Sequence, residues 1–375
     1  MYLKRLNQYP DAVCNDGSPG AYYFRGSNTS SVWIIHLQGG FWCWSEQTCL
    51  QRAKDSPQYV SSNGYPSVGG PIGGLFNQNA TINGFAHANV AYVMYCSSDA
   101  FSGNAPVHKT SVNLNNITQW QFRGLSIVQS VVQDLFSNQG LDSASHILLS
   151  GCSAGGQGVI NVVDRIDDQL QVLFSSSQRK PYFKAFADAG WMNNFLPQSS
   201  NTPMLNQFIS GFNLWHGEPN KRCALSNPNY EYLCYFSQFA FPHIQQPILI
   251  QSNQYDSFQT TWNCGCSPPF SKSQLSYFDQ LRIGFNYSMQ IVIDPITESS
   301  IYSAACFYHC LSEDSTFYSI YIEETQPSSK FYGKQFSLAQ VLAQWYFEIE
   351  PAIAPSYLQA QCDGFNCSPG CPNVS

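Results

Sequence analysis

Residues 146–158 read HILLSGCSAGGQG, and this stretch decides the fold. A short apolar strand runs directly into Gly151-Cys152-Ser153-Ala154-Gly155, a G-x-S-x-G pattern, and a helix-like segment follows. Glycines on both sides allow a sharp turn that residues with a Cβ resist. The pattern predicts that Ser153 stands at the apex of a strand-to-helix turn as a nucleophile. The alternative is a glycine-rich turn that only packs closely.

The composition narrows the class of protein. At 375 residues the chain is long enough to bury a large core. Charged residues make up only 11% and the net charge is −7, with no basic run, so we expect no nucleic-acid partner. No apolar run approaches the ~18 residues of a membrane span, so we expect none.

Fourteen cysteines indicate an oxidising compartment. Many lie in polar, turn-rich stretches, where disulfides explain them better than reduced thiols do. A zinc site at Cys264-Gly265-Cys266 is the disfavoured alternative, because no C-x-x-C pair recurs at finger spacing. We expect a short Cys43–Cys49 disulfide, and Cys362, Cys367 and Cys371 tied within the tail or to nearby loops.

The sequence also predicts a secreted or lumenal glycoprotein. The opening MYLKRLNQYP has no apolar segment, so a secretory signal is expected to have been removed or to lie outside this sequence. Asn-x-Ser/Thr sequons predict N-linked glycans at some of Asn28, Asn79, Asn116, Asn286, Asn366 and Asn373.

Strand and helix patterns alternate along the chain. Apolar runs predict strands at 31–40, 88–98, 146–150, 184–190, 247–253 and 289–295, and helical periodicity predicts helices at 121–140, 159–174 and 337–348. This alternation predicts an α/β fold with a mostly parallel central sheet covered by helices on both faces. Residues 41–87 and 191–246 are predicted to be loop-rich insertions. We expect one domain over 1–375, with a Cys-rich tail from about 356.

A serine nucleophile of this kind is followed in the chain by an acid and then by a histidine. Seven histidines are present, and His309 in CFYHC has the right order and lies on a predicted loop after a strand. For the acid, Asp256 directly follows the strand at 247–253. Asp188 and Asp294 also end predicted strands, and position alone leaves Asp294 open as a rival.

An oxyanion hole needs a second backbone donor besides the N–H of Ala154. The segment Gln38-Gly39-Gly40-Phe41-Trp42 follows an early strand, and its glycines allow main-chain N–H groups to turn into a cavity. Its two aromatic residues are expected to wall an acyl or sugar pocket. The alternative is a β-turn followed by two core aromatics.

Seven motifs, taken together and in order, resemble the pectin acetylesterase/Notum family of secreted carboxylesterases. The resemblance covers most of residues 15–315, whereas the last 60 residues carry little of it. The motifs are HLQGGFWCW…C (36–49), YCSSDAFSG (95–103), GCSAGGQG (151–158), FADAGW (186–191), HG…C (216–223), QYDSFQ (254–259) and CFYHC (306–310).

The resemblance implies an α/β-hydrolase-like fold and a Ser–Asp–His triad without a metal or other cofactor. Matched by position, the triad falls on Ser153, Asp256 and His309, which favours Asp256 over Asp294. The implied oxyanion donors are Gly40, Phe41 and Ala154, and Trp42 is expected to contact the substrate.

Two departures bear on the substrate. Phe41 stands where Notum-like members carry tryptophan, and Cys152 with CFYHC resembles the pectin acetylesterase side. The sequence therefore predicts a secreted serine carboxylesterase that removes a small acyl group, acetyl foremost, from a glycan or glycoconjugate. Cys152 as the nucleophile is disfavoured because it lies one residue off the apex. The remaining alternative is a catalytically silent binding or structural member of an extracellular assembly.

Overall fold

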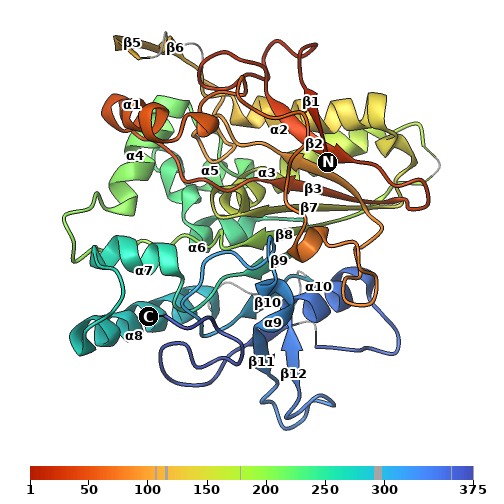
Figure 1. The fold of residues 1–375 in the computed structure, drawn as a ribbon, viewed down its shortest axis with the longest axis vertical. Helices are drawn as coiled ribbons and strands as arrows, with labels where there is room; N and C mark the ends of the chain where they lie inside the picture. The colour runs from red at the N-terminus through yellow and green to blue at the C-terminus, as the bar shows by residue number, and fades with distance from the viewer. Residues whose placement is uncertain (106–107, 115–116, 178, 291–297, 356, 375) are drawn as a thin grey trace.

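A computed structural model describes residues 1–105, 108–114, 117–177, 179–290, 298–355 and 357–374. Its main feature is a nine-stranded sheet in the order β1-β2-β4-β3-β7-β8-β9-β10-β13 (Figure 1). The pairs β1–β2 and β2–β4 are antiparallel, and the pairs from β4 to β13 are parallel. These strands are β1 Tyr2–Arg5, β2 Ala21–Arg25, β3 Val32–Leu37, β4 Asn89–Val93, β7 His146–Cys152, β8 Tyr182–Asp188, β9 Ile248–Gln251, β10 Ser300–Ser303 and β13 Leu358–Gln359.

Helices and short ribbons surround this sheet. The α-helices are α1 Glu46–Asp55, α2 Gly124–Asp134, α3 Ala154–Leu173, α4 Met204–Trp215, α5 Lys221–Ser226, α6 Ser237–Ala240, α7 Ser257–Cys264, α8 Lys272–Gln290, α9 Thr316–Ser319 and α10 Leu338–Phe347. Short 3-10 turns occur at Pro57–Tyr59, Gly74–Phe76, Leu141–Ser143, Glu231–Tyr235 and Phe241–His243, and a π-helical turn at Leu135–Gln139. Two antiparallel pairs lie outside the main sheet, β5 His108–Leu114 with β6 Ile117–Trp120 and β11 Tyr321–Glu323 with β12 Gln335–Ser337.

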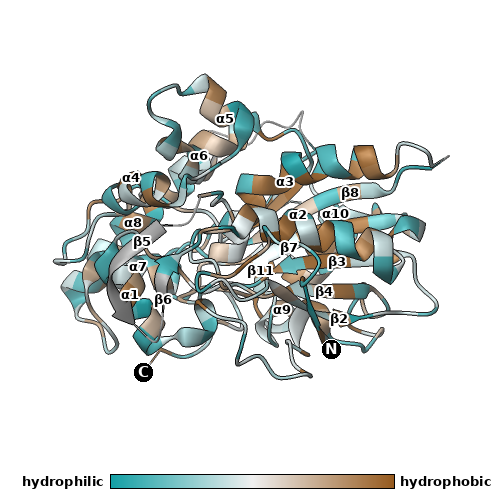
Figure 2. Ribbon diagram, turned by 90° about the horizontal axis from the view of Figure 1, so that it is seen from above, coloured by the Kyte–Doolittle hydropathy of each residue, from teal (hydrophilic) through white to brown (hydrophobic). Residues whose placement is uncertain are grey.

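The central strands of the sheet are buried on both faces and are mainly apolar (Figure 2). Successive side chains of β7 alternate between the faces. Ile147 and Leu149 join the core beneath α2 and α3, whereas Leu148 joins the core beneath α10. The predicted α/β-hydrolase-like architecture, a mostly parallel sheet between helices, is confirmed.

Several element predictions were wrong in detail. Met289 and Gln290, expected to begin a strand over 289–295, end α8, and 291–297 lie outside the described residues; the strand before His309 is β10 instead. The insertion at 191–246 contains long loops, as predicted, and also the helices α4, α5 and α6, which were not predicted. The helix after Ser153 begins at Ala154 and not at 159, since its glycine-rich first turn masks the apolar periodicity.

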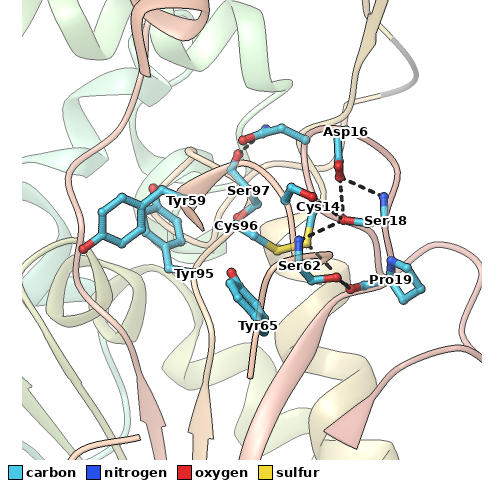
Figure 3. The surroundings of a disulfide bond; sticks show 12 residues. Cys14, Asp16, Ser18, Pro19, Tyr59, Ser62, Tyr65, Tyr95, Cys96 and Ser97 are labelled. Atoms are coloured by element: carbon cyan, nitrogen blue, oxygen red, sulfur yellow. Dashed lines mark hydrogen bonds between the residues drawn. A yellow bond between two sulfur atoms is a disulfide. The ribbon is translucent and has the colours of Figure 1, made fainter. Parts of the chain in front are cut away.

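All fourteen cysteines form disulfides, namely Cys14–Cys96, Cys43–Cys49, Cys152–Cys310, Cys223–Cys234, Cys264–Cys266, Cys306–Cys371 and Cys362–Cys367. Figure 3 shows the first, which joins the N-terminal loop to the segment after β4. Beside it the Ser62 hydroxyl donates to the carbonyl of Pro19 at 2.7 Å. The Ser62 hydrogen bond attaches the loop that contains Tyr59 to the segment before β2, and the Cys14–Cys96 disulfide attaches that segment to the end of β4. In the part of the chain that the structure describes, no helix has the length and apolar character to cross a membrane.

Candidate active site

Ser153 lies in a strained turn between β7 and α3. Its φ of 57° and ψ of −119° are unusual for a residue with a side chain. The turn is possible because its neighbours are small: a Cβ on Gly155 would lie 1.9 Å from the Leu37 carbonyl oxygen of β3. The Ser153 N–H donates to the Asp188 carbonyl at 2.8 Å, which ties the turn to the end of β8. We call residues 151–155 the elbow.

His309 joins Ser153 to Asp256. Its Nε2 lies 2.7 Å from Ser153 Oγ, and its Nδ1 lies 2.6 Å from Asp256 Oδ2. Asp256 is also the N-cap of α7, where its Oδ1 accepts the Gln259 N–H at 2.9 Å. The carboxylate is 2% exposed and the imidazole 22%, so the serine end of this chain is the end that a substrate can reach.

The surroundings of His309 favour its charged form. Burial alone lowers the pKa of the imidazole, but Asp256, through its charge and its hydrogen bond, acts in the opposite direction. The charges of Asp188 and Glu313 add to this effect, and the pKa of His309 lies above its ordinary value. An imidazolium formed when Ser153 gives up its proton is therefore stabilised.

Ser153 and His309 open into a cleft of about 520 Å³. Gly40 and Phe41, from the loop after β3, line it together with the elbow. In the described residues no acceptor is found for the backbone N–H groups of Gly40, Phe41 or Ala154. Gly40 has a φ of 144°, and a Cβ there would lie 2.6 Å from the Tyr59 ring, so the loop needs glycine at this position.

The two walls of the cleft differ. On one side the Phe41 ring centroid lies 5.2 Å from Phe258 and 5.3 Å from Trp262, and Phe258 lies 5.5 Å from the His309 ring. The other lining residues are mostly polar: Gln38, Arg52, Ser56, Tyr59, Tyr92 and Glu313. One wall is therefore apolar and the other carries hydrogen-bonding groups and charges.

Trp42 does not line this cleft. Its side chain is 2% exposed, its Nε1 donates to Gln207 Oε1 at 3.1 Å, and its ring packs on Phe208. The substrate contact expected of Trp42 does not fit this position. The backbone turns at Gly40 and Phe41, where φ is 144° and 60°, and Phe41 rather than Trp42 lines the cleft.

Of the rival acids and the rival nucleophile, Asp188 and Cys152 are described by the structure, and both have other partners. Asp188 accepts backbone N–H groups from Leu311 and Ser312, and Asp294 lies outside the described residues. Cys152 is bonded to Cys310, so it offers no thiolate. The Sγ atoms of these two cysteines and the Asp188 carboxylate lie within 4.8 Å of one another, but a disulfide removes the thiolates that a metal would bind.

The sequence matches the pectinacetylesterase family over residues 1–371. The chain belongs to this family. Similar curated proteins include the palmitoleoyl-protein carboxylesterase notum1a of zebrafish, 27% identical over 96% of this chain and 70% of its own length. The human palmitoleoyl-protein carboxylesterase NOTUM is 26% identical over 96% of this chain and 71% of its own length. The protein is therefore a carboxylic ester hydrolase.

A solved structure shows the same fold. The Wnt deacylase Notum from Drosophila superposes with a TM-score of 0.85 and 23% sequence identity, over 100% of this chain and 99% of that one. This similarity supports the α/β-hydrolase-like fold, and the identity is too low to transfer a substrate.

Three features of the site were missed at the sequence level. Arg52 and Glu313 line the cleft, and the Cys152–Cys310 disulfide joins the neighbours of Ser153 and His309. Only the disulfide could have been predicted from the sequence, since each of its cysteines is adjacent to a predicted site residue. The positions of Arg52 and Glu313 depend on how distant loops pack, which local pattern does not report.

Proposed function

We propose that this protein is a serine esterase that removes acetyl groups from a glycan, with Ser153, His309 and Asp256 as its catalytic residues. The observation that carries the proposal is the hydrogen-bonded chain Asp256–His309–Ser153, which ends at an open cleft. Beside it are backbone N–H groups that have no acceptor within the described part of the chain. Family membership supports the reaction class.

The proposed reaction has two steps. His309 Nε2 takes the proton of Ser153 as Oγ attacks the ester carbonyl carbon, and Asp256 holds the imidazole in the tautomer that this requires. The negative charge on the carbonyl oxygen meets the N–H groups of Ala154 and the 40–41 loop. The alcohol leaves with the proton from His309. Water, deprotonated by His309, then attacks the acyl-enzyme and releases the acid.

The apolar wall supports a small acyl group. The rings of Phe41, Phe258 and Trp262, with Trp44 against them, pack on one another beside His309, and we propose that they limit the length of the acyl chain. The names of the animal relatives give palmitoleoyl as their acyl group. The proposed difference in chain length therefore depends on this aromatic cluster.

The polar wall supports a sugar as the alcohol. The Arg52 guanidinium lies 4.8 Å from the Tyr59 ring centroid and donates through Nε to Ser98 Oγ at 2.8 Å. Arg52 lines the cleft, and among the described residues it has no carboxylate within ion-pair distance. Sugar hydroxyl or carboxylate groups are the acceptors that such a guanidinium binds well.

The test is hydrolysis of graded substrates. 4-Nitrophenyl esters from acetyl to palmitoyl report chain length, and acetylated acidic and neutral oligosaccharides report the alcohol, with Ser153→Ala as the blank. We expect kcat/KM to be highest for acetyl and to fall with every added pair of carbons. Preference for the longest esters would contradict the proposed small acyl group. Wild-type turnover no faster than that of Ser153→Ala would instead favour the alternative of a catalytically silent binding protein.

We also propose that the protein is secreted or lumenal and N-glycosylated. Seven disulfides support an oxidising compartment. Asn28, Asn79 and Asn373 are exposed, whereas the Nδ2 groups of Asn286 and Asn366 donate to Gln254 and to the Pro372 carbonyl. Asn116 lies outside the described residues.

We expect glycopeptide mass spectrometry of the secreted protein to find glycans at Asn28, Asn79 or Asn373 and not at Asn286 or Asn366. The reason is that a glycan replaces a hydrogen of the same Nδ2 that already donates at the last two sites. Occupancy confined to Asn286 and Asn366 would contradict this assignment.

A further inference from the structure

Asp188 contacts Ser153 and the segment that follows His309, and it has no part in the reaction described above. It is the last residue of β8 and has no exposed surface. Its carbonyl accepts the N–H of Ser153, and its carboxylate Oδ2 accepts those of Leu311 at 2.9 Å and Ser312 at 2.7 Å. One residue thus holds the elbow with its backbone and the segment after His309 with its side chain.

The Cys152–Cys310 disulfide makes a second bridge between the same two segments. Cys152 precedes Ser153, Cys310 follows His309, and their Cα atoms are 5.9 Å apart. The sulfur atoms lie within 4.8 Å of the Asp188 carboxylate, so the two bridges are adjacent to each other.

The segment that they hold has little support of its own. Residues 304–315, here called the histidine loop, run between β10 and α9 without helix or strand. No ladder of backbone hydrogen bonds fixes His309 there. A misplacement of ~1 Å in a catalytic group can cost on the order of 10²-fold in rate, so the anchoring of this loop matters to the reaction.

We propose that Asp188 and the Cys152–Cys310 disulfide form a clamp that sets the distance between His309 and Ser153, with Asp188 as a positioning residue. The proposal rests on the catalytic roles proposed above for Ser153 and His309. Asp188 acts through the backbone of the histidine loop and does not itself touch the reacting atoms.

Asp188 also acts on His309 through its charge. Burial raises the pKa of the Asp188 carboxyl to about 6, so at pH 7 it is mostly ionised. The charged groups around His309 are Asp256 from the start of α7, Asp188 from β8 and Glu313 from the histidine loop, and Arg52 of α1 lines the same cleft. Loss of the Asp188 charge therefore lowers the pKa of His309.

The experiment compares Asp188→Asn with Asp99→Asn. Asp99 is a matched control, because it is equally buried, its pKa is also raised to about 6, and it accepts backbone N–H groups from Phe101 and Gly124. No effect of Asp99 on His309 is found. The measurements are kcat and KM for an acetyl ester across pH, the rate of Ser153 labelling by a fluorophosphonate, and the thermal midpoint.

We expect Asp188→Asn to lower kcat and the labelling rate by ~10- to 100-fold with a smaller change in KM. The reason is that the Leu311 N–H also donates to Oδ1 at 3.2 Å, and an NH₂ group at either oxygen position faces at least this N–H. The acid limb of the pH profile should move to lower pH, a change that a merely structural role would not produce. Wild-type kcat and pH profile in Asp188→Asn, or the same changes in Asp99→Asn, would overturn the proposal.

The double variant Cys152→Ala/Cys310→Ala tests the disulfide, and it keeps the proposal testable if Asp188→Asn does not fold. A disulfide has no charge, so we expect a lower kcat with the acid limb in its wild-type place. Wild-type kcat in the double variant would refute the clamp. Wild-type protein that hydrolyses no ester and is not labelled at Ser153 would instead refute the proposed function, which separates the two failures.

Discussion

The elbow and the histidine loop face each other across 2.7 Å, yet they are built in opposite ways. The elbow is short and locally determined: a strand, a glycine on either side of Ser153, and a helix that begins at Ala154. The histidine loop has no regular structure and depends on partners from remote parts of the chain. Asp188 is about 120 residues away in sequence, and the tail residues Asn366 and Ser368 bind the N–H groups of Phe307 and Ala305.

This difference explains where the site tolerates change. Sterics fix the elbow, so a single methyl group is enough to disrupt it. Hydrogen bonds and disulfides fix the histidine loop, and each of them can be removed alone. Adding a Cβ at an elbow glycine should therefore unfold the protein, whereas removing one support of the histidine loop should lower its rate.

The largest expected effect is that of Ser153→Ala. On the proposed mechanism it removes the nucleophile, and we expect kcat to fall by ~10⁶-fold, as in other serine hydrolases. The fold should be retained, because a small side chain is replaced by a smaller one. Steady-state hydrolysis, with circular dichroism as the folding control, checks both points. Wild-type turnover in this variant would show that the nucleophile is a different residue.

Asp256→Asn should come next, with a loss of kcat of up to ~10⁴-fold, because an amide at this position favours the wrong imidazole tautomer. Asp294→Asn is the comparison, since Asp294 was the rival acid in the sequence, and it should cost far less. Kinetics of the two purified variants decide between them. A greater loss of kcat in Asp294→Asn would show that Asp256 is not the acid of the triad.

Gly155→Ala tests the steric side of the comparison. The added Cβ would lie 1.9 Å from the Leu37 carbonyl oxygen, which neither strand nor helix can avoid without moving. We expect the free energy of unfolding to fall on the order of 4 kcal/mol, among the largest effects of a single substitution. Gly64→Ala is the control, because nothing lies within 4 Å of a Cβ there. Equal urea midpoints for the two variants would contradict this view of the elbow.

The smallest expected effect concerns pH. His309 must be neutral to take the Ser153 proton, so activity falls as the pH drops through its raised pKa. Glu313→Gln removes one negative charge that raises this pKa, and the acid limb of kcat/KM should move to lower pH by less than about one unit. Glu348→Gln, which removes an exposed charge paired with Lys184, should leave the limb in place. A shift of the acid limb to higher pH in Glu313→Gln would contradict the conclusion that the charge of Glu313 raises the pKa of His309.

Sequence patterns predict features that depend on neighbouring residues better than features that depend on contacts between distant segments. The strand and glycines around Ser153 lie within 13 consecutive residues, so periodicity and turn chemistry were sufficient to predict the elbow and the parallel sheet. Trp42 was misplaced because a pattern does not tell which of two adjacent aromatic residues faces the cleft. Long α8 was missed because its hydrophobic face is weak, with polar residues between its aromatic ones.

The anchoring of the histidine loop by the tail has a consequence for synthesis of the protein. Cys306 is bonded to Cys371, and β13 adds to the sheet beside β10. β1 to β9 and the elbow all precede these contacts in the sequence. The histidine loop obtains its last supports only once residue 371 is present. A chain truncated before that residue is therefore expected to keep the elbow and still be inactive.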